Sequence, residues 1–220
     1  MERENENLAR RLAVRIGLLV VATAVYGAVL ATWRSPLMAA YAAAKLPAVF
    51  VGATLVVSVF CWMAGLLAGA DLRYVEVLDF VFSAMAIAGA ILLALAPVVF
   101  FFIVSAAPDA GTAEEMRFAH ACLLLVHILV FSAAGAVGNL TLYRALKARV
   151  PHGCRLGLLM VLWLASFAVV GCQLGWMARP LVGSPNIEVE FLRTDALDSN
   201  FLESLFKQII PNIIHKGAVS

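Results

Sequence analysis

Two histidines inside one long apolar stretch are the residues of this chain best suited to proton or ligand chemistry. His120 and His127 lie within residues 118–143, which carry no formal charge, and an ionisable side chain there is costly unless it has a partner or a function. Seven residues apart, they share a helix face but are separated by about 10 Å along its axis, so they cannot ligate one metal ion. They could line a proton or ligand pathway, or each could pack against a polar group of another helix, for which Gln173 is a candidate.

Three further polar side chains lie in or beside the apolar stretches. Glu76 and Asp79 are three residues apart, which places both carboxylates on one face near the start of a helix, where the helix dipole already favours negative charge. Asn139 is a candidate for a hydrogen bond between helices. The sequence contains no glycine-rich phosphate loop, no G-x-S-x-G and no H-E-x-x-H. It therefore predicts no catalytic residue, no metal and no cofactor, and it favours a non-enzymatic protein.

The composition indicates what kind of scaffold must position these residues. Hydrophobic residues make up 63% of the chain and charged residues only 14%, whereas about a quarter of the residues of a soluble domain are charged. The four cysteines are scattered without a C-x-x-C pair, so no disulfide framework is predicted. We expect an all-α, polytopic membrane helical bundle with lipid as its main partner, and no nucleic-acid partner.

Five apolar stretches are long enough to cross a bilayer core of about 30 Å. Ser35-Pro36 should end the first span, and the alanine-rich residues 37–45 then predict a short interfacial helix that stops at Leu46-Pro47. Residues 112–115 read Thr-Ala-Glu-Glu, which is typical of a capping box at the start of a helix. The predicted transmembrane helices cover about residues 16–33, 47–70, 79–106, 117–143 and 156–178.

The distribution of lysine and arginine predicts the orientation of the spans. With the amino-terminal segment 1–15 inside, nine basic residues face the cytoplasm, and the loop 144–155 contributes the most compact group. The tail 179–220 then lies on the other side of a bacterial inner (cytoplasmic) membrane.

The sequence of the tail predicts a surface that contacts lipid or a partner protein. Apolar pairs recur in about residues 200–210 with the spacing of an amphipathic helix, which would lie in the membrane interface or dock on another protein. The candidate contact residues are Trp176, Arg179, Pro180, Phe201, Leu202, Leu205, Phe206, Ile209 and Ile210.

Two patches of the sequence carry a resemblance. One contains Tyr26-Gly27, residues 33–37 (Trp-Arg-Ser-Pro-Leu) and Lys45-Leu46-Pro47; the other contains residues 173–176 (Gln-Leu-Gly-Trp) and continues through Arg-Pro and Gly-Ser-Pro to residue 193. Together they resemble a family of bacterial multi-pass inner-membrane proteins, which implies a location but no activity. The five-span plan is also similar, at the level of architecture, to the Yip1-type proteins of vesicle trafficking.

The predicted orientation places both patches on the same side of the membrane, so residues 37–45 and 179–193 should form one surface. The leading hypothesis is a scaffold or accessory subunit that binds other membrane subunits, or itself, through this outer surface and the amphipathic tail. The alternative is a small channel or transporter subunit that uses the face of His120 and His127. A second alternative, which rests on the similarity to Yip1-type proteins, is a membrane-shaping or trafficking protein.

Overall fold

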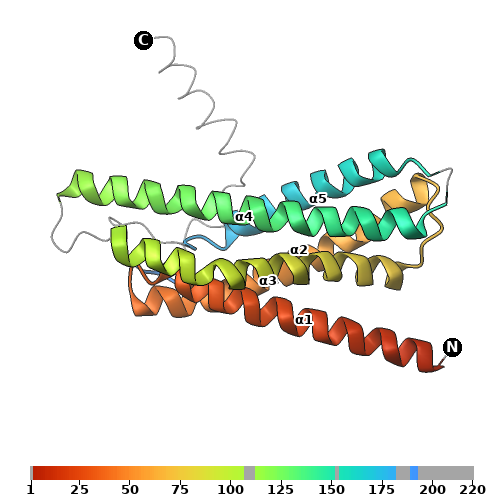
Figure 1. Ribbon diagram of the computed structural model, residues 1–220, viewed down its shortest axis with the longest axis horizontal. Helices are drawn as coiled ribbons and strands as arrows, with labels where there is room; N and C mark the ends of the chain where they lie inside the picture. The colour runs from red at the N-terminus through yellow and green to blue at the C-terminus, as the bar shows by residue number, and fades with distance from the viewer. Residues whose placement is uncertain (1, 107–111, 152–153, 182–188, 193–220) are drawn as a thin grey trace, which may run out of the picture.

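The computed structural model consists of long helices that run side by side (Figure 1). It describes residues 2–106, 112–151, 154–181 and 189–192, and this part of the chain contains no strand. The five helices are α1 (Glu2–Ala31), α2 (Pro36–Leu67), α3 (Tyr74–Ala106), α4 (Ala113–Arg149) and α5 (Leu156–Met177). Each is long and apolar enough to cross a membrane, as the sequence predicted for a multi-pass membrane protein.

Helix α2 differs from its prediction, because the separate interfacial helix at 37–45 is not present as such. These residues are the first turns of α2, which continues without interruption through Pro47. The proline removes one backbone donor, but neighbouring helices can maintain a transmembrane helix at such a point. Pro47 is itself buried, and continuing the helix keeps Met38, Ala42 and Leu46 buried as well. Ser35 caps the start of α2 by accepting a hydrogen bond from the backbone amide of Met38 at 3.1 Å.

The helices also extend beyond the apolar stretches. Helix α1 includes most of the polar segment 1–15, and α4 runs through the basic residues as far as Arg149. The Glu, Arg, Lys and Ala residues of these extensions have high helix propensity, and no proline or glycine interrupts them. The predicted capping box is confirmed: the Thr112 hydroxyl accepts from the amide of Glu115, whose carboxylate accepts from the amide of Thr112 at 2.7 Å.

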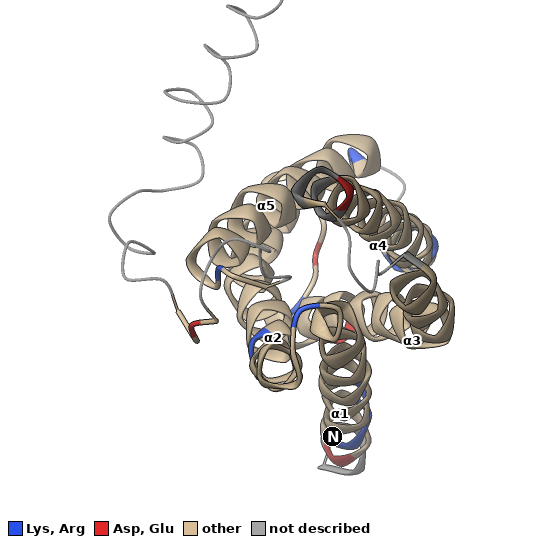
Figure 2. Cartoon of the chain, turned by 90° about the vertical axis from the view of Figure 1, so that its left-hand side faces the viewer, with Lys and Arg blue, Asp and Glu red and all other residues tan. Residues whose placement is uncertain are grey.

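The helices follow one another around a ring in the order α5, α2, α3 and α4, and α1 lies outside it against α2 and α3 (Figure 2). The ring is poorly closed, because α4 and α5 contact each other much less than the other neighbouring pairs do. We call this opening the α4/α5 seam. Helix α5 is therefore held mainly by α2, and its only buried residues are Leu159 and Trp163.

Helices α1 and α2 cross closely at Gly27. A Cβ atom at this position would lie 2.6 Å from the carbonyl oxygen of Ala42 and 3.2 Å from Cβ of Leu46. The two backbones can approach this closely only because residue 27 has no side chain. The crossing lies near the end of the bundle that contains the α1–α2 connection, which we call the Trp33 end. The opposite end, with the α4–α5 connection, is called the Arg149 end.

Candidate functional site

A buried lysine ties the chain that follows α5 to the first turns of α2. Lys45 is 4% exposed, its Nζ donates a hydrogen bond to the carbonyl oxygen of Pro180 at 3.0 Å, and the same atom lies 4.9 Å from the ring centroid of Phe191. Burying an ammonium group is costly, and a carbonyl oxygen together with an aromatic face offsets part of that cost. We call Lys45, Pro180 and Phe191 the Lys45 clamp.

Contacts on the preceding turns of α2 extend the Lys45 clamp. The ring of Tyr41 meets the ring of Phe191 edge to face, with centroids 5.2 Å apart, and Val189 packs against the buried cluster of Ala31, Met38 and Ala42. Pro180, Val189 and Phe191 therefore all lie against the first turns of α2. The prediction that residues 37–45 and the segment after the fifth span lie together is confirmed for the part of that segment that the structure describes.

The three predicted contact residues at the end of α5 are half-buried. The guanidinium of Arg179 lies over the indole of Trp176, 3.5 Å from the ring centroid. Nε and Nη2 of Arg179 are buried without a hydrogen-bond partner among the described residues. Leu181 packs against the cluster that contains Tyr26. Trp176, Arg179 and Pro180 are thus held by the bundle, while Phe191 and Leu192 are about half exposed.

His127 has a partner on another helix, and that partner is Tyr26. Nδ1 of His127 lies 3.0 Å from the Tyr26 hydroxyl, and both side chains are buried. Gln173, the candidate from the sequence, is not the residue that Nδ1 meets. Nε2 of His127 is also buried, and no described residue forms a hydrogen bond with it. A packing role for His127 therefore accounts for the hydrogen bond of Nδ1, but it does not account for the buried Nε2.

His120 contacts a different residue. Its ring lies against the indole of Trp33, with centroids 4.9 Å apart and planes tilted by 34°. Nδ1 of His120 is buried without a hydrogen-bond partner in the described part of the chain. Within that same part, no three His, Cys, Asp or Glu side chains are grouped so that they could hold a metal ion. The two histidines share a helix face but occupy separate environments.

Glu76 and Asp79, the two acids at the Arg149 end, each form an ion pair with an arginine of another helix, in addition to any interaction with the helix dipole. Asp79 forms an ion pair with Arg15 of α1, which also donates to the Asp79 carbonyl oxygen at 2.9 Å. Glu76 accepts from Nη2 of Arg149 at 2.9 Å. Although the two acids are close in sequence, they bind different helices. They connect α3 to α1 and to α4, which is a structural role.

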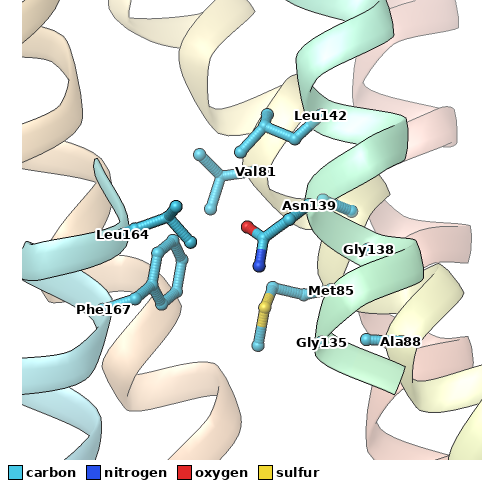
Figure 3. Close-up of a pocket in the computed structure, with 10 residues that line it drawn as sticks. Val81, Met85, Ala88, Gly135, Gly138, Asn139, Leu142, Leu164 and Phe167 are labelled. Carbon is cyan, nitrogen blue, oxygen red and sulfur yellow. The ribbon is translucent and has the colours of Figure 1, made fainter. Parts of the chain in front are cut away.

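Asn139 faces a cavity of about 180 Å³ between α3, α4 and α5 (Figure 3). Its carboxamide projects from α4 into the space in front of Phe167 and Leu164 of α5, and Met85 of α3 lies beside it. Asn139 is the only one of the ten lining residues with a polar side chain. We call this space the Asn139 cavity. It lies beside the α4/α5 seam, in the half of α4 nearer the Arg149 end.

Two residues with important contacts were not singled out from the sequence. Lys45 was noted only as the end of a short helix and as part of the resemblance, although a lysine within an apolar stretch that continues on both sides is itself a signal of a buried partner. Tyr26 was noted only for the resemblance, although its hydroxyl must find a partner inside a span. The predicted amphipathic helix, with Phe201, Leu202, Leu205, Phe206, Ile209 and Ile210, lies outside the described residues.

Besides the histidine face, the described part of the chain offers two candidate sites. The Lys45 clamp presents aromatic and aliphatic side chains at the Trp33 end, and the Asn139 cavity encloses one carboxamide among apolar groups. Comparison with protein-family models, with curated proteins and with solved structures gives no match for the chain.

Proposed function

We infer that the protein is a non-enzymatic scaffold or accessory subunit of a membrane complex, and that it binds its partner with the surface around the Lys45 clamp. The observation that carries this proposal is the clamp itself. A buried ammonium holds the chain after α5 against α2 through Pro180 and Phe191. The half-exposed Phe191, Leu192 and Leu37 are then available to another protein.

A surface that is already held in place favours binding. Association must otherwise offset the entropy of ordering loops and side chains, which costs about 0.5–1.5 kcal/mol per immobilised side chain. The hydrogen bond from Lys45, the edge-to-face contact of Tyr41 with Phe191 and the packing of Val189 fix this segment before any partner arrives. Aromatic side chains on such rigid supports are typical anchors of protein interfaces.

In this proposal the Trp33 end faces the periplasm of a bacterial inner membrane. The basis is the concentration of lysine and arginine at the other end. Arg149 ends α4, Arg73 directly precedes α3, and Arg15 of α1 is paired there with Asp79 of α3. The partner then contacts the protein on the side opposite the cytoplasm, and lipid covers the exposed apolar faces of the helices.

Loss of the Lys45 clamp is expected to release the partner. Lys45→Met keeps an unbranched side chain of similar length but removes the ammonium, and Phe191→Ala removes the aromatic face without changing a fully buried residue. We expect native mass spectrometry of protein extracted in mild detergent to show a heteromeric mass for the wild type. The heteromeric fraction should fall at least about fivefold in both variants, since a central anchor typically contributes 2 kcal/mol or more.

Lys147→Met is the matched control. Lys147 lies at the Arg149 end, where its Nζ is 6.0 Å from the ring centroid of Tyr143. This variant should keep the heteromeric mass. The proposal is wrong if the wild type carries only lipid, or if both clamp variants retain the partner as fully as the control does.

The histidine face supports a second candidate function, a small channel or transporter subunit. The specific observation is the buried Nε2 of His127, which no described residue satisfies and which could bind a proton or a small ligand. Under this hypothesis, proteoliposomes conduct protons or a small solute, and His127→Leu reduces the flux at least about tenfold, a typical contribution of a residue that transfers protons. Leu129→Ala, on the exposed side of α4, is the control. Absent flux in the wild type, or equal flux in both variants, would exclude this candidate.

A further inference from the structure

We propose that the Asn139 cavity is a binding site for a small apolar molecule that carries one carbonyl or hydroxyl group and enters from the membrane through the α4/α5 seam. The site is separate from the Lys45 clamp, because its lining comes from α3, α4 and α5, in the half of α4 nearer the Arg149 end. The proposal therefore does not depend on the accessory-subunit function.

The volume and lining of the cavity define the ligand class. A cavity of about 180 Å³ is close to the roughly 150 Å³ engineered cavity that stays dry and binds benzene. Met85, Leu164 and Phe167 offer contacts to a ring, and Figure 3 shows them around a common space. One ring with few substituents fits this volume.

The single carboxamide defines the polar group. No hydrogen bond joins the carboxamide of Asn139 to another described residue, although its Oδ1 can accept and its Nδ2 can donate twice. A fully buried polar group without a partner costs about 1–3 kcal/mol, and the half-buried carboxamide of Asn139 bears part of that cost. A ligand carbonyl would accept from Nδ2, and a ligand hydroxyl would donate to Oδ1, so either group recovers this cost on binding.

The packing of the helices provides both the space and the entrance. Gly138 allows α4 to approach α3 closely, since a Cβ there would lie 3.0 Å from the carbonyl oxygen of Ala84. At Gly135, one turn away, a Cβ would meet nothing within 4 Å. The space beside Gly135 is thus part of the cavity, and the cavity adjoins the α4/α5 seam, where α4 and α5 make few contacts. An apolar molecule dissolved in the bilayer reaches Asn139 by passing between these two helices.

Two variants and two small probe molecules test which class of ligand the cavity binds. 4-Fluorophenol and fluorobenzene differ by one hydroxyl, and ¹⁹F NMR of the full chain in nanodiscs, corrected with empty nanodiscs, measures saturable binding of each. Asn139→Leu keeps the size of the side chain and removes the hydrogen bond. The affinity for 4-fluorophenol should therefore fall about tenfold, and the affinity for fluorobenzene should not change. Gly135→Leu fills the cavity and should abolish the binding of both probes.

Gly171→Leu is the matched control for the second variant. A Cβ at Gly171 also meets nothing within 4 Å, but this residue does not line the cavity, so both probes should still bind. Thermal unfolding midpoints of all variants establish that they fold. The proposal is overturned if the folded wild type shows no saturable binding, or if Asn139→Leu does not distinguish the two probes. Loss of a co-purifying protein from Gly135→Leu, without probe binding by the wild type, would instead make the cavity a docking site for a partner helix.

Discussion

Replacement of Gly27 by alanine is expected to lower the stability of the protein more than any other single methyl addition at a glycine of the described helices. The new Cβ would lie 2.6 Å from the carbonyl oxygen of Ala42 and 3.0 Å from its carbon, and both are backbone atoms of α2 that cannot move independently. The helices α1 and α2 must therefore separate. Overpacking of this kind costs about 1–3 kcal/mol and sometimes more.

The measurement is the midpoint of thermal unfolding in a mild detergent. For a chain of this size a loss of 3 kcal/mol lowers the midpoint by about 6–12 °C. Gly17→Ala on the same helix is the control, because a Cβ at Gly17 meets nothing within 4 Å and alanine has the higher helix propensity. An unchanged midpoint for Gly27→Ala would show that α1 and α2 do not cross as closely as described.

Replacement of Trp163 by alanine is expected to detach α5 from α2. Trp163 is 1% exposed, and its Nε1 donates to the carbonyl oxygen of Cys61 at 2.9 Å. Because α5 is poorly supported by α4 and buries only Leu159 besides this residue, the Trp163 side chain makes a large contribution to its attachment. Truncating a buried tryptophan to alanine typically costs about 3–5 kcal/mol.

Cross-linking measures this detachment directly. A Cβ at Gly52 would lie 3.8 Å from Cδ1 of Leu174, so Gly52→Cys with Leu174→Cys, in a chain without its native cysteines, should react rapidly with a short bis-maleimide. Trp163→Ala should slow this reaction at least about tenfold. Trp163→Phe loses the hydrogen bond, worth about 1 kcal/mol, and part of the buried ring, but it keeps more of the packing than alanine does, so its effect should be smaller. Equal cross-linking in all three chains would mean that other contacts hold α5.

Much of the fold was predictable because the lipid bilayer that surrounds the helices restricts the possible structures. A bilayer admits backbone only as helices or closed barrels, so five long apolar stretches led directly to five helices. The capping box at Thr112 was predictable because it depends on residues three positions apart. The continuation of α2 through Pro47 was not predictable, because the effect of a proline on a helix depends on the packing around it. That packing is a tertiary property, which a pattern of neighbouring residues does not contain.

The candidate sites were less predictable than the helices. His127 and Asn139 could be selected because polar groups in apolar stretches are conspicuous, but their surroundings could not be deduced. Tyr26 and His127 are 101 residues apart, and nothing in one sequence pairs them. The order of helices around the ring was equally hidden, since spans that are apolar on all sides do not indicate which side meets which neighbour. The poor contact between α4 and α5, and thus the Asn139 cavity, follows from that order.

The attachment of α5 to α2 also has a consequence for biosynthesis. Trp163 and Cys61 are 102 residues apart, so the ribosome makes all of α3 and α4 after the acceptor and before the donor. During this interval the side of α2 that carries Cys61 cannot meet its final neighbour. The same delay applies to Lys45, because Pro180 is synthesised later still. Docking of the last helix and closure of the Lys45 clamp are therefore both late steps, and a ribosome that stops after α4 leaves a chain with neither.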